Sequence, residues 1–460
     1  MITLRGSKAA VREPHEQAVS SSVPVPNSAL WRNWGRVESS TPSFIAAPAS
    51  AGDVQAIVRD ARDRSLTVKP IGASHSFTAI GATSGIRLTL DGLSGLVAYD
   101  RARGRVTIGA GTHLYELGDI LLPLGLALEN MGDIDRQTIS GAISTGTHGT
   151  GASFGGIATQ VVGVTLVDGQ GNLVRVNEQE NPDLLPAVAL GLGALGVLVD
   201  VTLQCVPAFV LSAVERPLPV AEVLESFVER SLEHDHFEFY WFPHTQTALT
   251  KTNTRLPNDS PRAPLSKVSH WVDDELMANG LYRAVCGIGK ALPSTTPPVS
   301  RFIQRLTGNR SFSDYSHRVF VTDRSVRFRE MEYALPLDQV VPAVREIMTL
   351  IERKGWRVSF PIEVRSAAAD GVWMSTANER LSGYIAVHRY WRENHVEYFE
   401  AVERILRSYG GRPHWGKMHQ LSANDVAELY PHLPRFLAAR DRLDPARVFA
   451  NPYLDRVLGR

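Results

Sequence analysis

The apolar and polar positions near the start of the chain predict a β-α-β unit. Apolar runs over residues 43–47 and 66–69 predict two strands. A helix is predicted between them, because Ser50 can cap its N-terminus and apolar residues follow at the spacing of one helix face. These apolar residues are Val54, Ile57, Val58 and Ala61. Short strands over 86–90 and 105–109 follow, and then a helix over 115–122 that Pro123 ends.

The pattern changes to hairpins after residue 160. Strands over 161–168 and 172–176, joined by a turn over 168–171, form one hairpin, and a strand over 198–203 follows. We expect a domain boundary near Pro207 and a less regular second domain. There, we predict strands over 237–242, 332–335, 360–365 and 383–391, helices over 337–354 and 396–406, and loops with helices over 255–310.

Composition narrows the class of protein. The chain has 460 residues, 43% of them hydrophobic, so two or three domains are expected. Lysine plus arginine and aspartate plus glutamate both number 48, which gives no support for nucleic acid as a partner. The two cysteines, Cys205 and Cys286, lack metal-ligand spacing, and a reducing compartment fits them. Residues 1–28 are polar and rich in Ser and Pro, which predicts a disordered arm.

The hydropathy of the chain bears on its location. No stretch approaches the ~20 uninterrupted apolar residues of a transmembrane helix. Residues 1–11 carry scattered charges and no apolar core of a signal peptide. We therefore expect a cytoplasmic protein, and peripheral association with a membrane stays open.

The first stretch that carries chemistry is Pro70-Ile-Gly-Ala-Ser-His-Ser-Phe77, which directly follows a predicted strand. Gly72 permits a tight turn. Ser74, His75 and Ser76 leave that turn with polar side chains and free backbone N–H groups, which can wrap an anionic pyrophosphate. The alternative is a surface turn with an exposed histidine, and this stretch alone does not decide between them.

The second stretch, residues 139–151, has four Gly and six Ser, Thr or His residues. Its small residues let a ligand approach the backbone, and its hydroxyls and N–H groups are donors suited to a pyrophosphate. The alternative is a flexible linker, but linkers rarely contain a histidine together with two isoleucines. A second Gly-rich run, over 190–197, precedes the strand over 198–203.

The third stretch is Phe360-Pro-Ile-Glu-Val-Arg365. On a strand, Glu363 and Arg365 share one face and Ile362 and Val364 take the other. Two charges on an apolar strand indicate either a structural ion pair or a clamp for sugar hydroxyls, with Glu363 accepting and Arg365 donating. His388, on the strand over 383–391, is a candidate for the same cavity.

The fourth stretch, Gly411-Arg-Pro-His-Trp-Gly-Lys-Met-His419, brings His414, Lys417 and His419 together. A metal site would need further ligands at tight spacing, and none is present, so no metal is expected.

In this order, the four stretches resemble those of the FAD-dependent sugar-1,4-lactone oxidoreductases of the vanillyl-alcohol-oxidase type. The loop with His75 is similar to their flavin-attachment loop, and Gly146-Thr-His-Gly149 is similar to their second FAD-binding segment. His414-Trp-Gly-Lys417 resembles their signature near the C-terminus. The resemblance covers residues 30–460 and is closest to bacterial L-gulono-1,4-lactone dehydrogenases and D-arabinono-1,4-lactone oxidases.

The resemblance implies an α+β fold with FAD as cofactor. It implies a two-subdomain FAD-binding domain of the PCMH type over 29–207 and a substrate domain with an antiparallel sheet and flanking helices over 208–460. The C-terminal segment of that second domain returns to the flavin. In many relatives the histidine that corresponds to His75 is bonded covalently to the flavin. The implied cofactor-binding residues are Ile71, Gly72, Ala73, Ser74, His75, Ser76, Asp133, Ser140, Gly141, Ser144, Thr147, His148, Gly149, Thr150, Gly151, Val197, His414 and Lys417.

The resemblance also implies the chemistry: a secondary alcohol of a sugar lactone gives a hydride to flavin N5 and yields an ascorbate-type product. The catalytic candidates are Glu363, Arg365, Lys417 and His388. Arg365 and Lys417 can stabilise an alkoxide, Glu363 or His388 can accept the proton, and Lys417 can instead lie at flavin N1. The alternatives are an alditol oxidase acting on xylitol or sorbitol with oxygen, and a flavoprotein without catalysis.

The electron acceptor is addressed by Ala110. It aligns with a family position near the flavin edge where a glycine leaves a path for oxygen, and one methyl group can fill such a space. This predicts a dehydrogenase that passes electrons to a quinone or a cytochrome. The alternative is that Ala110 is only a small residue in a tight strand and that oxygen is the acceptor.

Overall fold

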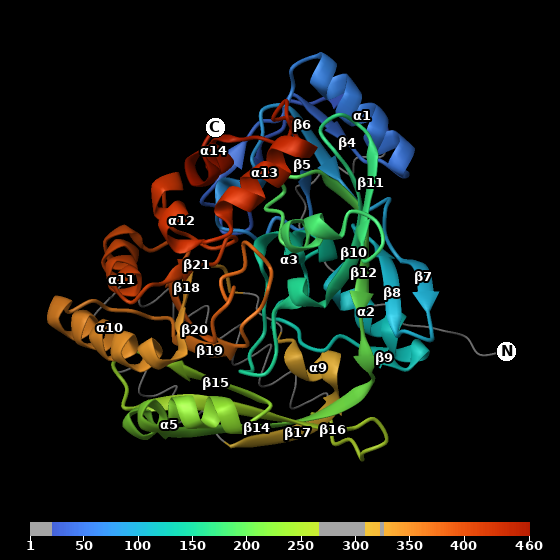
Figure 1. The fold of residues 1–460 in the computed structure, drawn as a ribbon. Coiled ribbons are helices and arrows are strands. Elements are labelled where there is room, and N and C mark those ends of the chain that lie inside the picture. Colours follow the sequence, from blue (N-terminus) through green and yellow to red (C-terminus); the bar gives the residue numbers. More distant parts are fainter. Residues whose placement is uncertain (1–20, 266–308, 323–325) are drawn as a thin grey trace.

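The computed structural model describes residues 21–265, 309–322 and 326–460. Its N-terminal half begins with a sheet of strand order β1-β4-β6-β5, in which β4, β5 and β6 are parallel (Figure 1). These strands are β1 (Val25–Pro26), β4 (Phe44–Ala46), β5 (Val68–Ile71) and β6 (Ile86–Thr89). Helix α1 (Ala51–Asp63) joins β4 to β5, and the Ser50 hydroxyl accepts from the Asp53 N–H at its start. The predicted β-α-β unit and its N-cap are confirmed.

Residues 21–28, at the end of the predicted disordered arm, are ordered in the structure. Strand β1 pairs with β4 through Val25 and Ile45, and the Asn27 amide donates to the Pro42 carbonyl. A short strand that contains proline suits this place, because it covers a sheet edge that would otherwise be open. Residues 1–20 of the predicted arm lie outside the described residues, as do residues 266–308 of the region predicted to hold loops and helices.

A second, antiparallel sheet has the order β11-β10-β12-β8-β7. Its strands are β7 (Leu96–Asp100), β8 (Arg105–Gly109), β10 (Val161–Val167), β11 (Leu173–Asn177) and β12 (Val197–Gln204). The predicted hairpin and the predicted strands over 105–109 and 198–203 are confirmed within about one residue. Helices α2 (Leu114–Leu121) and α4 (Leu185–Val188) and two small pairs accompany the sheet: β2 (Trp31–Arg32) with β3 (Ser39–Ser40), and β9 (Leu126–Ala127) with β13 (Val206–Pro207).

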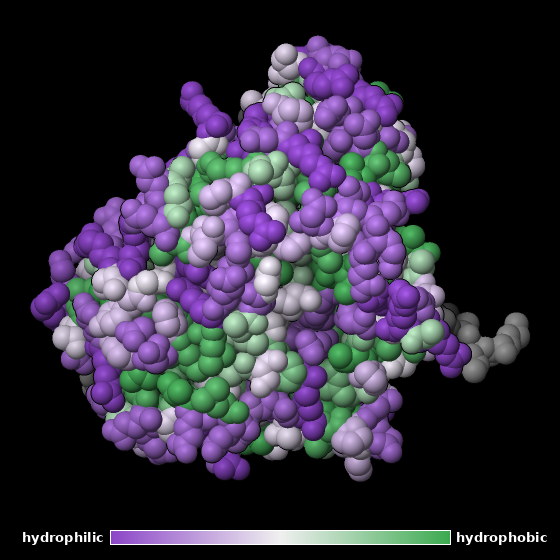
Figure 2. Space-filling model, in the orientation of Figure 1, coloured by the Kyte–Doolittle hydropathy of each residue, from purple (hydrophilic) through white to green (hydrophobic). Residues whose placement is uncertain are grey.

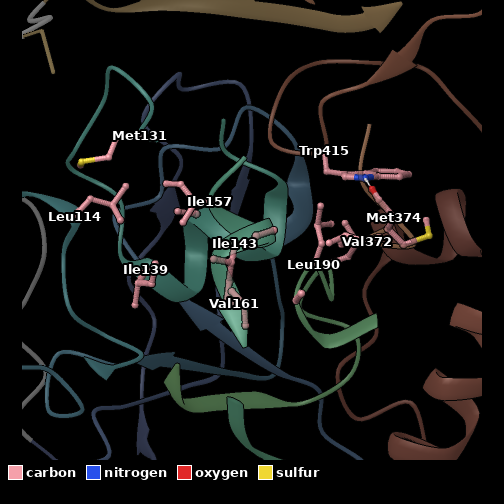
Figure 3. Packing of buried hydrophobic residues seen from close by; sticks show 14 of the residues in the cluster. Leu114, Met131, Ile139, Ile143, Ile157, Val161, Leu190, Val372, Met374 and Trp415 are labelled. Atoms are coloured by element: carbon pink, nitrogen blue, oxygen red, sulfur yellow. Dashed lines mark hydrogen bonds between the residues drawn. The ribbon is translucent and has the colours of Figure 1, made fainter. Parts of the chain in front are cut away.

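The stretch rich in glycine and serine begins with helix α3 (Ile139–Thr145), so it is not a flexible linker. The Thr138 hydroxyl accepts from the Gly141 N–H and caps the helix. Ile139 and Ile143 are fully buried and point into a core with Ile157, Val161 and Leu190 (Figure 3). Packing of two isoleucines four residues apart therefore outweighs the low helix propensity of the residues around them.

The C-terminal half is built on an eight-stranded antiparallel sheet of order β17-β14-β16-β15-β19-β20-β18-β21. Its strands are β14 (Phe209–Pro219), β15 (His236–Trp241), β16 (Thr247–Pro257), β17 (Arg310–Tyr315), β18 (Phe328–Pro336), β19 (Ile362–Ala367), β20 (Ser382–Tyr390) and β21 (Arg412–Pro413). The strands predicted over 237–242, 332–335, 360–365 and 383–391 are confirmed within it. Sequence analysis missed β14 and β16, which have 11 residues each.

Helices cover one face of this sheet, and the N-terminal half of the molecule lies against the other (Figure 1). The covering helices are α5 (Val220–Glu233), α10 (Val340–Lys354) and α11 (Val396–Ser408). The remaining helices are α9 (Ser316–Phe320), α12 (Ala423–Leu429), α13 (Leu433–Leu443) and α14 (Pro452–Leu458). The C-terminal segment returns to the first sheet, where the Asn451 amide donates to the carbonyls of Ala79, Ile80 and Ala82.

These sheets and helices confirm the expected α+β class. Trp415 is fully buried between the two halves and donates its indole N–H to the Met374 carbonyl at 2.7 Å (Figure 3). Polar residues cover most of the face in Figure 2, with apolar groups in separate patches. Within the described ranges, no helix has the length and apolar character needed to cross a bilayer.

Candidate active site

The loop that follows β5 is fastened by the hairpin of β2 and β3. The Trp34 N–H donates to the Ser74 carbonyl at 2.8 Å, and the Trp31 indole donates to the Ser74 hydroxyl at 3.0 Å. The Asn33 amide donates to the Ser76 carbonyl at 2.9 Å. His75 is therefore held from both sides, and its ring stacks on Trp34 with centroids 5.2 Å apart.

The turn in this loop is made differently from the prediction. The residue with a left-handed backbone is Ser74, with φ 58°, and not Gly72. Glycine is needed at position 72 for a different reason: a Cβ there would lie 2.3 Å from the Thr138 hydroxyl oxygen. The loop and the start of α3 thus approach each other as closely as backbone and side chain allow.

A cavity of about 870 Å³ runs between this loop and α3. It is lined by small and hydroxyl-bearing residues from segments far apart in sequence: Gly72, Ala73, Ser74, His75, Ser76, Thr138, Ser140, Gly141, Ser144, Thr145, Gly193 and Gly196. Lys69, Ile71 and Leu198 also line it.

The donors of this cavity fit the pyrophosphate of FAD. Within the part of the chain that the structure describes, the backbone N–H groups of Ala73, Ser74 and Ser76 donate to no protein atom. Such groups need acceptors, and phosphate oxygens provide them. The residues present therefore fit the expected cofactor.

A second cavity, of about 680 Å³, continues from the first. His75, Ser76, Gln137 and Thr145 line both. The second cavity adds charged and aromatic groups: Trp34, Phe77, Asp133, Thr147, His148, Phe328, Glu330, Glu363, Arg365, His414 and Lys417. A long ligand can thus lie with one end among hydroxyls and the other end among charges, with His75 at the junction.

Arg365 is the centre of one charge cluster in the second cavity. It forms an ion pair with Glu363 on the same strand, donates from Nε to Glu238 at 2.8 Å, and lies 3.4 Å from Asp133. Burial alone would lower the pKa of Arg365, but these three carboxylates outweigh it and raise the pKa. The Tyr240 hydroxyl donates to Glu363 at 3.0 Å, so that carboxylate is held in place from two directions.

Lys417 is the centre of a second cluster. Its Nζ lies 2.5 Å from Glu330 and 2.8 Å from Glu332, both on β18. Burial would lower the pKa of Lys417, but the two carboxylates raise it above its ordinary value, so the lysine is charged. Burial together with the lysine charge lowers the pKa of His414 to about 3, so its ring is neutral. Because His414 Nδ1 accepts from the Gly416 N–H, the ring proton belongs on Nε2.

The structure brings most of the predicted residues together. Ile71, Gly72, Ala73, Ser74, His75, Ser76, Ser140, Gly141 and Ser144 line the first cavity. Asp133, Thr147, His148, Glu363, Arg365, His414 and Lys417 line the second. Val197 lines neither cavity, although its neighbours Gly196 and Leu198 line the first.

Three further predicted cofactor residues line neither cavity, and two of them, Thr150 and Gly151, join the two halves of the molecule. The Thr150 hydroxyl donates to the Phe237 carbonyl, and the Gly151 N–H donates to the Ser366 carbonyl. Gly149 lies so close to Met131 that a Cβ would be 2.2 Å from its carbonyl.

Two further histidines of the predicted stretches do not line the second cavity. His388 is one of them: it lies 3.2 Å from Glu330 and within 4.8 Å of a Glu363 carboxylate oxygen, and its Nδ1 contacts the Pro361 carbonyl. His419 contacts the Tyr453 hydroxyl at 2.9 Å and is also outside the lining.

Sequence analysis missed four residues of these clusters: Glu238, Tyr240, Glu330 and Glu332. Each pair is spaced by two on a strand that also carries aromatic or apolar residues, which puts both polar side chains on one face. This is the same signal that identified Glu363 and Arg365. Within the described residues, two sets of histidine and glutamate side chains have ligand atoms close enough together to hold a metal ion. Each set includes a carboxylate that already forms an ion pair with Lys417 or Arg365.

Comparison with known proteins agrees with this geometry. The fold is similar to that of cholesterol oxidase from Brevibacterium sterolicum, with a TM-score of 0.78 over 94% of this chain and 97% of that chain, at 18% identity. Residues 42–177 match a FAD binding domain. The protein is therefore a FAD-binding flavoprotein, and the expected cofactor is confirmed.

The family follows from residues 201–457, which match D-arabinono-1,4-lactone oxidase. The chain belongs to this family, and it is a FAD-dependent oxidoreductase that acts on CH–OH groups. It is 39% identical to L-gulono-1,4-lactone dehydrogenase of Mycobacterium tuberculosis, over 94% of this chain and 100% of that protein. It is 31% identical to L-gulonolactone oxidase of Bos taurus, over 93% of this chain and 98% of that protein.

Proposed function

We propose that this chain oxidises a sugar 1,4-lactone at a secondary alcohol and yields an ascorbate-type product. The observation that carries the proposal is the meeting of the two cavities at His75, with hydroxyls on one side and Glu363, Arg365 and Lys417 on the other. Two relatives are named for L-gulono-1,4-lactone chemistry, which gives the substrate class. When bound, FAD supplies a two-electron acceptor for the hydride.

The residues of the second cavity divide the remaining work. Glu363 accepts the proton of the substrate hydroxyl, because its carboxylate lines the cavity and is oriented by Tyr240 and Arg365. Arg365 and Lys417 hold positive charge where negative charge develops on the substrate oxygen. His388 contacts Glu330 at 3.2 Å and acts through that carboxylate. The neutral His414 presents an Nε2–H donor to a substrate oxygen or to the flavin edge.

The first cavity holds the pyrophosphate and the adenosine half of the cofactor. His75 bonds the flavin covalently in this proposal, because it lies at the junction of the cavities. The division of the chain near Pro207 into a FAD domain and a substrate domain belongs to the proposal as well. So does the cytoplasm as the location, in keeping with Cys205 as a free buried thiol.

Anaerobic titration of the holoenzyme tests this function. We expect L-gulono-, L-galactono- or D-arabinono-1,4-lactone to bleach the visible flavin absorbance, and xylitol to leave it unchanged. Glu363→Gln should keep its flavin and bleach more slowly. Bleaching by xylitol and none by the lactones would make the protein an alditol oxidase, and no bleaching by any of them would remove the proposed activity.

A further inference from the structure

A group of two tryptophans and three arginines lies beside His75 and is used by no step above. We call Trp34, Trp391, Arg36, Arg327 and Arg392 the rim patch. Trp34 stacks on the His75 ring at 5.2 Å with 19° between the planes, and it lines the second cavity. The rim patch is therefore continuous with the second cavity at His75, the residue proposed to bond the flavin.

The arginines of the rim patch are held by aromatic rings. Arg392 lies 4.6 Å and Arg36 lies 5.3 Å from the Trp391 ring centre. Arg327 lies 5.6 Å from the ring centre of Trp34 and 5.8 Å from that of Trp391, so it spans both. Stacking on the Trp391 ring leaves the guanidinium donors and the charge of Arg36 and Arg392 available to a partner.

Arg36 and Arg392 put two positive charges on the rim patch of a chain whose formal net charge is zero. Arg36 and Arg392 are exposed, and neither forms an ion pair with a described residue. The nearest acidic residue in sequence to Arg392 is Glu393, which already pairs with Arg389 at 3.2 Å.

The two tryptophans of the rim patch pack against a buried hydrophobic cluster. Phe77, Phe328 and Phe360 form a buried cluster with Val326 and Tyr390, and Trp34 and Trp391 pack against it. Trp34 meets Phe328 edge to face at 5.1 Å. A rigid surface of tryptophan and arginine has the composition of the residues that dominate protein–protein binding.

We propose that the rim patch is the docking surface for the electron acceptor, and that this acceptor is an electron-carrier protein with carboxylates on its contact face. The proposal rests on the proposed function, because each oxidised lactone leaves two electrons and two protons on the enzyme: the hydride, and the hydroxyl proton that Glu363 accepts. Two one-electron carriers take one electron each, and both protons pass to water. Positive charge at the exit attracts an acidic carrier and repels a basic one.

Native and succinylated cytochrome c form a matched pair of probes, because succinylation replaces lysine charges with carboxylates and leaves the haem. The holoenzyme is reduced photochemically without lactone and mixed with each form in a stopped-flow instrument. We expect reduction of the succinylated form to be about tenfold faster at low salt. The preference should vanish near 1 M salt, where the Debye length is about 3 Å.

The double variant Arg36→Gln/Arg392→Gln should lose the preference and keep wild-type bleaching by lactone. Arg435→Gln is the matched control, because Arg435 is also exposed and lies 4.5 Å from the ring centre of Trp373, outside the rim patch.

Equal or faster reduction of native cytochrome c, or an unchanged double variant, would overturn the proposal. Binding to anionic phospholipid vesicles that the double variant loses, without a preference between the cytochromes, would make this a membrane-facing surface and also overturn it. Failure of lactone to bleach the flavin would instead remove the proposed function, since photoreduction bypasses it.

Discussion

Replacing Lys417 with methionine tests whether its ammonium is the counter-charge of two buried carboxylates. The side chains of Lys417, Glu330 and Glu332 are 18%, 6% and 1% exposed. An exposed ion pair contributes about 0–1 kcal/mol, whereas removing one partner of a buried pair costs about 3–5 kcal/mol. With such small exposed fractions, the cluster behaves as a buried ion pair. We therefore expect the free energy of unfolding of Lys417→Met to fall by about 3 kcal/mol or more at neutral pH.

The wild type and the variant should differ in how their free energy of unfolding depends on pH. Burial alone would raise the pKa of Glu330, but Lys417 and His388 outweigh it and lower the pKa to about 2, and the pKa of Glu332 is lowered as well. In the wild type, the stabilisation from these carboxylates is thus present above the unfolded pKa of about 4.3 and is lost only as the pH falls through their folded pKa values.

The variant should behave in the opposite way. Without Lys417, burial and the neighbouring like charge raise the carboxylate pKa values above those of the unfolded chain. The folded variant then binds protons more tightly than the unfolded chain. Its stability should therefore fall as the pH rises above about 4.3, by up to about 1.4 kcal/mol per pH unit for each proton.

The assay is denaturant unfolding followed by tryptophan fluorescence at about pH 5, 6.5 and 8, with flavin content matched by absorbance. Lys354→Met is the control, because its pair with Glu397 at 3.1 Å is exposed, and its change should stay within about 0.5 kcal/mol. Lys417→Met/Glu332→Gln removes one of the two like charges and should flatten the pH slope. A Lys417→Met protein as stable as the wild type, with no pH slope, would refute the reasoning.

Three further predictions concern the site. Glu363→Gln should lower turnover by about 10²-fold with flavin content unchanged, and Arg365→Ala should also weaken lactone binding; steady-state kinetics that match the wild type in both would return the pair to a structural role. After acid denaturation, in-gel flavin fluorescence should stay with the wild-type protein and be absent from His75→Ala, whereas release of all the flavin from the wild type would exclude the covalent bond. Ala110 is fully buried and its carbonyl accepts from the Ser140 N–H. Stopped-flow reoxidation by oxygen should be slow in the wild type and faster in Ala110→Gly, and a fast wild-type reaction that the substitution leaves unchanged would identify an oxidase.

The helices and strands that sequence analysis predicted have a regular spacing of apolar residues and a recognisable residue at their start or end. Helix α1 has one apolar face and a serine cap, and α11 has one apolar face and ends before Gly410, whose φ is 70°. Strand β8 was predicted with its observed bounds because Val106 and Ile108 alternate with polar residues. In these segments local propensity and burial agree, so the pattern alone is sufficient.

The elements that it missed lack that agreement. Strand β14 is buried only in its first half, so the period fades towards Pro219, and β16 is rich in threonine with few apolar residues to mark a face. Their pairing with each other over 11 positions is a long-range contact that no local pattern reports. Helix α3 did carry a local signal, since Thr138 can cap a helix and Ile139 and Ile143 are four apart.

The choice between a structural ion pair and a clamp at Glu363 and Arg365 could not be made from the sequence, because the structure shows one arrangement that serves both. Arg365 has three carboxylate partners, which makes it structural, and it lines the second cavity, which puts it in reach of a ligand. Arg365→Ala would therefore remove a shared cation from three carboxylates and lower stability whatever the arginine does in catalysis. Glu363→Gln keeps the shape and the Tyr240 contact while removing one charge from an arginine that retains two others. A loss of turnover in Glu363→Gln at unchanged stability consequently carries more weight than any loss in Arg365→Ala.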